Sequence, residues 1–417
     1  MKIVVVGQGY VGLPVALRAV EVGLDVIGLD LDKHRVDQLR DARSYVSDVS
    51  DDHLRHALES GHYRPSGSYD DAAGFDVAVI TVPTPLTENM PDLTFIEQAA
   101  LALAPHVTCG SLVVLESTTY PGTTQEFLVP LFEQATRMTA GIDFHVGYSP
   151  ERIDPGNRSF DLATTPKVVS GVTDGCLRRV QDFYDLLIDC TVPVSTPKEA
   201  ELTKLLENTF RHVNIALVNE LAVFAHDLGI DIWESIDAAS TKPFGYLRFT
   251  PGPGVGGHCL PIDPSYLSWQ VKRRLGLSFR FVELANDVND HMPHYVVSRL
   301  LKLLNDDGKP VRRSRVLLLG LAYKKDTGDV RESPSLKIIE LLQEYGADLA
   351  GLDSHVEDHR WPSGVVRVDD LTTGLTGTDA VVVLAAHSDV DYAVLSQVDV
   401  PVLDTQHVVS GERVVAL

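Results

Sequence analysis

Two stretches at opposite ends of the 417-residue chain repeat one scheme of strand, loop, helix and strand. The first, residues 2–30, begins with an apolar run, continues with the glycine pattern GQGYVG and ends at Asp30. The second, residues 315–353, ends at Asp353, and a longer polar loop replaces its glycine turn. Strands that alternate with helices at this spacing predict doubly wound parallel sheets. Both ends of the chain are therefore predicted to form α/β domains.

The middle of the chain follows a helical pattern instead. From about Glu199 to Asp227, leucine, valine and phenylalanine recur at spacings of three and four residues, which predicts one long amphipathic helix. Helical stretches at 281–289 and 295–304 follow, while runs at 76–82 and 111–118 add strands to the first sheet. We therefore predict two Rossmann-like doubly wound parallel-sheet domains joined by a long central helix and a helical middle domain.

The expected domains have three distinct functions. The predicted ranges are a dinucleotide-binding domain at 1–198, a helical dimerisation domain at 199–305 and a C-terminal α/β domain at 306–417. The central helices carry a larger apolar face than one domain can cover, so we expect a homodimer or a higher homo-oligomer.

Charge and composition exclude several classes of protein. The chain has 58 acidic and 36 basic residues, a formal charge of −22, which repels nucleic-acid phosphates. No apolar run approaches the ~18 to 20 residues of a membrane span, and the chain enters a strand directly after Met1-Lys2, without a signal peptide. We expect a cytoplasmic enzyme that contacts neither nucleic acid nor membrane. Four scattered cysteines predict neither disulfides nor a metal site: Cys109, Cys176, Cys190 and Cys259.

The glycine pattern near the N-terminus predicts a dinucleotide site. Gly7 would permit the tight turn, Gly9 the approach of backbone N–H groups to a pyrophosphate, and Gly12 close packing of helix on strand. Asp30 would accept hydrogen bonds from the ribose hydroxyls and repel a 2′-phosphate, which favours NAD over NADP. An ordinary glycine turn is the alternative. Arg35 would lie near the adenine or balance Asp30, unless it is an exposed helix cation.

An irregular segment at 251–263 carries a candidate nucleophile. Two prolines and four glycines precede His258 and Cys259, so this backbone can present N–H groups and a thiol to a carbonyl or phosphorylated substrate. Asp263, four residues later, suits a base or a partner that orients the thiolate. A structural turn with an inert Cys259 is the alternative. For His258, packing is the alternative to a catalytic role.

The long helix carries a polar strip. Lys204 and Asn208 are one turn apart, and Arg211 and Asn214 extend the strip. A solvated stripe would explain the lysine, but asparagine is unfavourable inside helices unless its side chain has a partner. The segments ESTTYPG at 116–122 and YSPERIDPGN at 148–157 follow strands, where loops face the cofactor crevice of such a fold.

Taken together, these motifs resemble the UDP-glucose/GDP-mannose dehydrogenase family of nucleotide-sugar 6-dehydrogenases from residue 1 to beyond residue 353. The motifs that carry the resemblance are GQGYVGLP, VPTPLT, ESTTYPGTT, YSPERIDPGN, ELTKLLENTFRHVNIALVNE, PGPGVGGHCLPIDPSYL and GLAYKKDTGDVRESPS. The resemblance implies an N-terminal NAD domain, a central dimerising helix and a C-terminal domain for the nucleotide of the sugar.

The resemblance also implies a reaction. The family oxidises the C6 alcohol of a nucleotide sugar to a carboxylate in two hydride transfers to two NAD+, without releasing the aldehyde. Cys259 corresponds to the nucleophile that forms a thiohemiacetal and then a thioester, which water cleaves. Lys204 and Asn208 correspond to groups that stabilise oxyanions at C6, and Asp263 to the carboxylate that assists the first proton removal.

Further positions follow from the same resemblance. Thr118 and Glu151 correspond to the pair that positions and activates the hydrolytic water, and Arg248 or Lys242 to an arginine donated by the partner subunit. The cofactor set implied is Gly7, Gly9, Tyr10, Val11, Gly12, Asp30, Arg35, Pro83, Thr84, Ser117, Thr118 and Arg331. The substrate set implied is Glu151, Arg152, Lys204, Asn208, Arg211, Arg248, Phe249, Gly256, Tyr323 and Lys324.

The motifs favour UDP-N-acetylglucosamine as substrate, with UDP-glucose as the alternative; the segment PGPGVGGHC also occurs in UDP-N-acetylmannosamine relatives. Two other classes of protein are alternatives to a four-electron dehydrogenase. A two-electron hydroxy-acid dehydrogenase would have no use for Cys259 or for the second α/β unit. An NAD-responsive binding protein would need none of Lys204, Asn208, Cys259 and Asp263. The NADH formed per nucleotide sugar separates the three classes.

Overall fold

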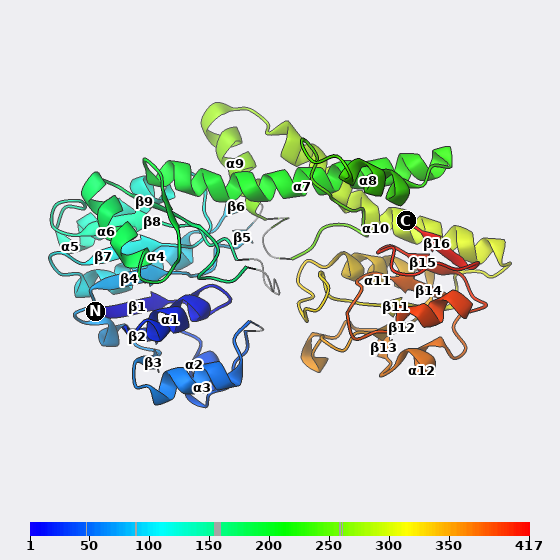
Figure 1. The fold of residues 1–417 in the computed structure, drawn as a ribbon, viewed down its shortest axis with the longest axis horizontal. Helices are drawn as coiled ribbons and strands as arrows, with labels where there is room; N and C mark the ends of the chain where they lie inside the picture. Colours follow the sequence, from blue (N-terminus) through cyan, green and yellow to red (C-terminus); the bar gives the residue numbers. More distant parts are fainter. Residues whose placement is uncertain (47, 88–89, 154–159, 258–259, 261) are drawn as a thin grey trace. The chain divides into compact units, whose positions relative to one another are not determined.

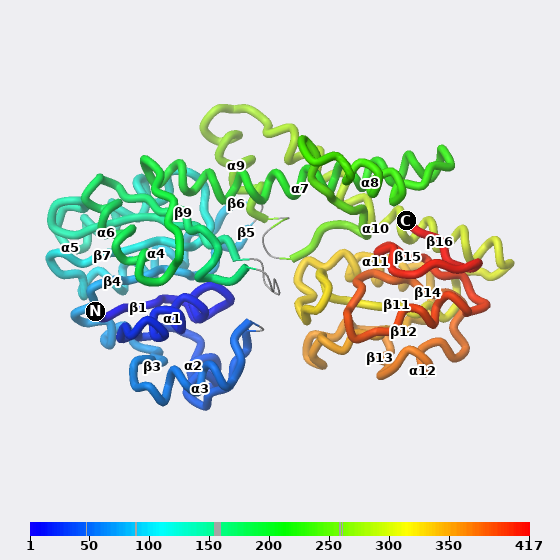
Figure 2. The backbone as a smooth tube through the Cα atoms, in the orientation of Figure 1, coloured from blue at the N-terminus to red at the C-terminus, as the bar shows by residue number. Residues whose placement is uncertain are grey.

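The computed structural model describes residues 1–46, 48–87, 90–153, 160–257, 260 and 262–417. These residues form two compact units (Figure 1). Unit 1 contains Met1–Glu207 and Arg273–Leu275, and unit 2 contains Asn208–Lys272 and Gly276–Leu417. Helix α7 (Pro197–Leu228) runs without a break (Figure 2) and contributes residues to both units.

Unit 1 is built on an eight-stranded sheet with the order β10-β9-β8-β7-β4-β1-β2-β3. Every neighbouring pair is parallel except β8 with β9, so β9 and β10 extend the doubly wound sheet beyond an antiparallel step. The strands are β1 (Lys2–Val6), β2 (Asp25–Leu29), β3 (Tyr63–Ser66), β4 (Val77–Ile80), β7 (Leu112–Leu115), β8 (His145–Tyr148), β9 (Lys167–Gly171) and β10 (Thr191–Pro193), and β5 (Leu86–Thr87) pairs separately with β6 (Met90–Pro91).

Helices cover both faces of this sheet because its strands are apolar on both sides. In β1, Ile3 and Val5 pack towards α1, α3 and α6, whereas Val4 and Val6 pack towards α4 and α5. The helices are α1 (Gly12–Glu21), α2 (Lys33–Arg40), α3 (Asp51–Glu59), α4 (Thr94–Leu103), α5 (Val129–Thr136) and α6 (Asp174–Tyr184), with short helical turns η1 (Tyr69–Ala72), η2 (Ala104–His106) and η3 (Thr124–Leu128).

Unit 2 repeats the strand order on a smaller scale. Its six-stranded parallel sheet has the order β13-β12-β11-β14-β15-β16, which matches β3-β2-β1-β4-β7-β8 of unit 1 position by position. The strands are β11 (Arg315–Leu319), β12 (Asp348–Leu352), β13 (Val365–Arg367), β14 (Ala380–Val383), β15 (Val402–Asp404) and β16 (Val414–Ala416). The predicted fold class is thereby confirmed.

The remaining helices are largely those of the predicted helical middle. They are α8 (Ile232–Ser240), α9 (Asp263–Leu275), α10 (Arg280–Asp306), α11 (Pro334–Tyr345) and α12 (Leu371–Leu375), with the turns η4 (Asp358–Arg360) and η5 (Tyr392–Gln397). The two predicted stretches at 281–289 and 295–304 form one helix, α10, which continues through Pro293. In the described part of the chain, no helix has both the length and the apolar character of a membrane span.

Candidate functional site

The glycine turn after β1 is tight at its first and third glycines and open at its second. Gly7 has a φ of +91°, and a Cβ on Gly12 would lie 1.8 Å from the Gly7 carbonyl oxygen. A Cβ on Gly9 would meet no described atom within 4 Å. The open side of Gly9 therefore leaves space for a diphosphate, while Gly12 allows α1 to begin against the turn. Tyr10, which follows Gly9, is exposed.

Asp30 closes β2 beside this turn and is largely buried. Its carboxylate accepts hydrogen bonds of 2.9 Å from the backbone N–H groups of Gln8 and Asp32. The Arg35 guanidinium lies 3.6 Å from the same carboxylate and over the Tyr45 ring. Of the alternatives for Arg35, the geometry matches a cation that balances Asp30. These residues fit the adenosine end of NAD.

The loops after β4 and β7 are tied to each other in the same unit. The Thr84 hydroxyl donates to the Thr118 carbonyl oxygen at 2.7 Å, and the Ser117 hydroxyl donates to the Val82 carbonyl oxygen at 2.7 Å. Pro83 is exposed between these bonds, and Thr118 is half-buried. The strand order switches between β1 and β4, where ligands bind in such sheets; β4 borders this switch and β7 is the next strand beyond it.

A buried ionic cluster lies behind these loops in unit 1. The Lys167 ammonium, at the start of β9, is 3.1 Å from both Glu116 Oε1 and Glu151 Oε2. Burial alone would raise the pKa of Glu151, but Lys167 and the Ile153 N–H outweigh burial and hold the pKa of that carboxyl below its usual value. Burial raises the pKa of Glu116, which Lys167 only partly offsets.

Two predicted substrate residues adjoin this cluster. Lys204, half-buried on α7, donates from its ammonium group to the Glu151 carbonyl oxygen. Arg152 forms a 2.7 Å ion pair with Glu207 and donates to the Pro166 carbonyl oxygen. The structure thus brings Lys204 and Glu151 into direct contact through the main chain.

In unit 2, Asn208 and Asp263 form a buried pair. Asn208 Nδ2 donates to Asp263 Oδ2 at 2.6 Å, and each residue is 4% exposed. Asn219 donates to Asn289 and accepts from the Gly252 N–H, both at 2.9 Å. These two helix asparagines therefore have the partners that their helix positions require. Asn214 instead bonds to the Phe210 carbonyl oxygen of its own helix.

The described glycines of the segment at 251–257 serve close packing. A Cβ on Gly256 would lie 2.6 Å from the Glu332 carbonyl oxygen, and one on Gly257 would lie 2.7 Å from the Tyr323 ring. The Gly257 N–H donates to the Arg331 carbonyl oxygen at 3.2 Å. These contacts give the glycines a packing role, in agreement with the structural turn that was the alternative to a ligand-binding loop. Residues 258, 259 and 261, and with them His258 and Cys259, lie outside the described residues.

A pocket of about 430 Å³ opens in unit 2 beside this segment. Four cations contribute to its lining, and they come from α7, from the segment before the glycines and from the loop after β11. The cations are Arg211, Arg248, Lys324 and Lys325. Tyr323 and Phe249 add aromatic surface. Such a lining suits a ligand that carries both a polyanion and a flat ring.

Two predicted arginines are held by carboxylates of unit 2. Arg248 donates to Asp237 at 2.6 Å. Arg331 binds Asp329 through two nitrogens, at 2.9 and 2.6 Å. The predicted roles of Arg248 at the partner's substrate and of Arg331 at the cofactor remain predictions.

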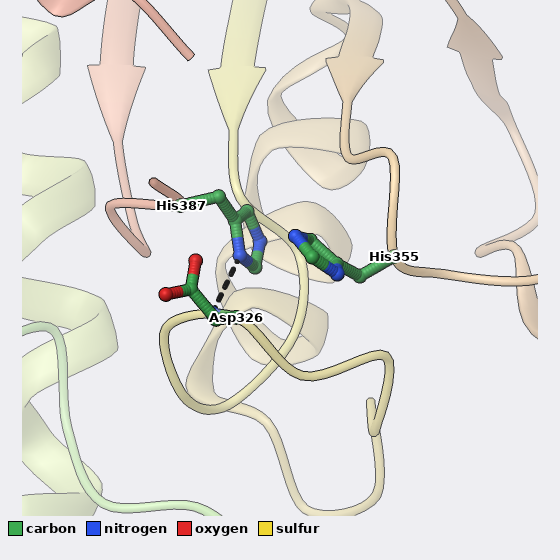
Figure 3. A group of neighbouring side chains, drawn as sticks. All are labelled: Asp326, His355 and His387. Atoms are coloured by element: carbon green, nitrogen blue, oxygen red, sulfur yellow. Dashed lines mark hydrogen bonds between the residues drawn. The ribbon is translucent and has the colours of Figure 1, made fainter. Parts of the chain in front are cut away.

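Asp326, His355 and His387 gather in unit 2 after β11, β12 and β14 (Figure 3). Their spacing resembles that of metal ligands, but both ring nitrogens of His387 are engaged. Nδ1 accepts from the Asp326 N–H at 2.9 Å, and Nε2 lies 3.0 Å from Asp353. The ring therefore has no lone pair available for a cation, and the cluster supports the loop after β11 instead.

Asp353 directly follows β12, just as Asp30 directly follows β2. Here the carboxylate accepts hydrogen bonds from the Leu321 and Ala322 N–H groups, at 2.7 and 3.0 Å, besides its contact with His387. Backbone N–H groups of the loop after β11 thus bind the carboxylate that a ribose would contact in a dinucleotide domain. This explains structurally why unit 2 departs from unit 1 in that loop.

Two residues of the buried cluster were not predicted as functional from the sequence. Glu116 was quoted only as part of a motif, and Lys167 was not singled out. A lysine that opens the apolar run VVSG is a usable signal, because a charge at a buried strand must find a partner. The sequence does not indicate that the partner comes from the loops after β7 and β8.

Three features together indicate an NAD-dependent dehydrogenase of phosphorylated substrates. They are a glycine turn open at its second glycine, an acidic residue after the next strand, and a cationic pocket in a second α/β unit. Models of the UDP-glucose/GDP-mannose dehydrogenase family match the chain with the NAD binding domain at 1–188, the central domain at 198–291 and the UDP binding domain at 317–416. The chain belongs to this family, and it is an NAD-dependent nucleotide-sugar dehydrogenase.

Individual relatives act on different sugars according to their names. The UDP-N-acetyl-D-mannosamine dehydrogenase of Pyrococcus horikoshii is 33% identical over 390 residues, which cover 93% of this chain and 90% of that protein. The UDP-N-acetyl-D-glucosamine 6-dehydrogenase of Pseudomonas aeruginosa is 36% identical over 395 residues, which cover 93% and 91%. The solved structure of the P. horikoshii enzyme superposes with a TM-score of 0.90 at 30% identity and covers 100% of this chain and 98% of that one.

Proposed function

We propose that this enzyme oxidises the C6 alcohol of a UDP-N-acetylhexosamine to the carboxylate in two successive two-electron steps. The observation that carries the proposal is the buried hydrogen bond between Asn208 and Asp263. It fixes a carboxylate only four residues after Cys259, and its donor, Asn208, lies one helical turn after Lys204 on α7. A base, an oxyanion-stabilising cation and a thiol are the three groups that a four-electron oxidation requires.

The first oxidation needs a base and a cation at C6. Asp263 receives the hydroxyl proton, directly or through water, and Asn208 keeps the Asp263 carboxylate in place. The Lys204 ammonium stabilises the alkoxide that develops at C6. When bound, NAD+ accepts a hydride from C6 in each of the two oxidations. The glycine turn and Asp30 hold the cofactor's diphosphate and ribose.

The second oxidation uses Cys259 in this proposal. The thiolate adds to the aldehyde carbon, and loss of a hydride from the resulting thiohemiacetal gives a thioester. Water then cleaves the C–S bond, which returns the thiol and releases the carboxylate. Thr118 and Glu151 position that water. The sum is alcohol, two NAD+ and water giving carboxylate, two NADH and three protons.

The proposed substrate class rests on the pocket and on the motifs. The cationic lining of the pocket in unit 2 suits a diphosphate, and Tyr323 and Phe249 suit a pyrimidine ring. The similarity to the P. aeruginosa enzyme supports UDP-N-acetylglucosamine as first choice. The similarity to the P. horikoshii enzyme supports its C2 epimer, UDP-N-acetylmannosamine. UDP-glucose is the alternative without an acetamido group.

We propose a homodimer as the working assembly and the cytoplasm as its compartment. Exposed apolar side chains follow α7 at helical spacing: Leu202, Leu206, Phe210, Leu217, Leu221, Phe224 and Leu228. A second copy of the helix would remove them from water. Cys109 and Cys190 are exposed and, among the residues that the structure describes, form no disulfide, which suits a reducing compartment.

The test is a substrate panel with NADH counted against sugar consumed. The four substrates are UDP-glucose, UDP-N-acetylglucosamine, UDP-N-acetylgalactosamine and UDP-N-acetylmannosamine. The proposal expects two NADH per sugar with an N-acetylhexosamine. One NADH per sugar would assign a two-electron oxidation instead, and no turnover on any of the four would overturn the proposed substrate class. Fastest turnover on UDP-glucose would overturn the substrate class but not the reaction.

A further inference from the structure

We propose that Lys167 is a positioning residue for the hydrolytic step. Its ammonium group, anchored on Glu116, holds the Glu151 carboxylate in one orientation and leaves one acceptor site of that carboxylate for the water that cleaves the thioester. This inference rests on the proposed function, because Glu151 acts on that water only if a thioester forms.

The ammonium group of Lys167 is fully engaged inside unit 1. Its three hydrogens face three acceptors: Glu116 Oε1 and Glu151 Oε2, each at 3.1 Å, and the Pro150 carbonyl oxygen at 3.5 Å. Lys167 is 4% exposed. No hydrogen is left for a substrate, so the lysine acts through its neighbours rather than on the sugar.

The Glu151 carboxylate is nearly saturated by this arrangement. Oε1 accepts from the Arg152 and Ile153 N–H groups at 2.7 Å each, which uses both of its lone pairs. Oε2 accepts from Lys167. Among the described residues, only the second lone pair of Oε2 has no donor. A water bound to Glu151 therefore has one place to donate its hydrogen bond.

Glu116 anchors the other side of the lysine. It is 1% exposed and also accepts a hydrogen bond from the Tyr184 hydroxyl through Oε1. Five charged or titratable side chains make up the buried cluster, and they come from the loops after β7 and β8, from β9, from α6 and from α7. They are Glu116, Glu151, Lys167, Tyr184 and Lys204. A cluster this buried cannot reorient cheaply, so it holds Glu151 rigidly.

The ordering of Glu151 predicts which step Lys167 serves. In hydrolysis a misplacement near 1 Å can cost about 10²-fold in rate, whereas neither hydride transfer involves Glu151. Loss of Lys167 is therefore expected to slow thioester cleavage and to spare the two oxidations. Loss of Glu151 itself should show the same pattern.

The experiment compares Lys167→Met, Lys167→Arg and Glu151→Gln by rapid mixing of enzyme, NAD+ and the best UDP-sugar of the panel. Lys167→Met should give a burst of two NADH per active site at close to the normal rate. A steady rate lowered about 10²-fold and a covalent sugar adduct in the intact mass should follow. Lys167→Arg keeps the charge and should restore most of the steady rate. Lys198→Met is the matched control, since Lys198 is an exposed lysine paired with Glu126 at the start of α7.

A pH profile separates orientation from loss of folding. Without the ammonium group the pKa of Glu151 rises, so the acid limb of the hydrolysis rate should move to higher pH in Lys167→Met. If that variant does not fold, Lys167→Met with Glu116→Gln removes both charges of the inner pair and takes its place.

Burst and steady rates lowered by the same factor would make Lys167 merely structural and overturn the inference. Slow hydrolysis in Glu151→Gln with normal hydrolysis in Lys167→Met would also overturn it, with the proposed function intact. Fewer than two NADH per sugar in the unaltered enzyme would instead overturn the proposed function.

Discussion

Asn208 donates a hydrogen bond of 2.6 Å from its side-chain amide to Oδ2 of Asp263, and both residues are almost completely buried. The bond joins α7 to the first residue of α9. A buried carboxylate keeps a fixed direction only while its partner is present. Asn208 is therefore one of the groups that fix where the proposed base points.

Asn208→Ala should lower kcat of the first oxidation by up to about 10²-fold, because the Asp263 carboxylate loses a buried donor that helps to orient it. The measurement is the rate of the first NADH formed with C6-deuterated substrate, whose isotope effect should increase as hydride transfer becomes limiting. Asn214→Ala is the control, since Asn214 bonds only to its own helix, and it should leave the rate unchanged. An unaltered first oxidation in Asn208→Ala would remove the orienting role.

Gly9 and Gly12 of the glycine turn should respond differently to alanine. Gly9→Ala should fold normally, because its Cβ meets open space, but should weaken NAD+ binding at least about tenfold, since the methyl group occupies the place of the diphosphate. Gly12→Ala should destabilise the fold itself, because its Cβ would lie 1.8 Å from the Gly7 oxygen. Thermal denaturation with and without NAD+ separates the two effects. Equal Tm losses in both variants would contradict this division.

Glu201 should make stability depend on pH. It is buried on α7, and burial raises its pKa to about 7, although it accepts hydrogen bonds from Thr124 and Gly122. The folded state therefore binds a proton more tightly than the unfolded state, whose pKa is near 4.5. Stability from this group is complete below pH 4.5 and falls by about 3 kcal/mol as the pH rises to 7.

Urea unfolding from pH 4.5 to 8 measures this effect. Glu201→Gln cannot ionise, so the free energy of unfolding of the variant minus that of the unaltered enzyme should rise across this interval and then level off. A difference that is constant with pH would show that Glu201 has an ordinary pKa in the folded protein.

The apolar face of α7 should hold two copies together. Leu217→Asp with Phe224→Asp places charge on two exposed positions of that face, so folding should be kept and association lost. Sedimentation velocity should show a dimer for the unaltered protein and a monomer for the variant. A monomeric unaltered protein would contradict the proposed assembly.

The fold was predictable from local sequence patterns, whereas the side-chain contacts within the site were not. The apolar strands at 2–6 and 315–319 and the 3.6-residue period of α7 reflect burial, which the order of residues encodes directly. The contact of Asn208 with Asp263 spans 55 positions, and that of Lys167 with Glu116 spans 51, so their partners depend on strand order. Pro293 did not end α10, since packing of Met292 and Val296 on unit 2 outweighs one missing hydrogen bond.

Asp30 and Asp353 directly follow corresponding strands of two sheets with the same order, and each accepts a hydrogen bond from the loop after the first strand, through the Gln8 N–H in unit 1 and the Leu321 N–H in unit 2. In unit 2 the Asp353 carboxylate accepts hydrogen bonds from the backbone N–H groups of Leu321 and Ala322 and also contacts His387. Grafting GQGYVG into the loop after β11 would not by itself free Asp353 for a dinucleotide ribose, because the His387 contact comes from the loop after β14. The internal contacts of one aspartate thus distinguish the unit that matches a UDP binding domain from the unit that matches an NAD binding domain.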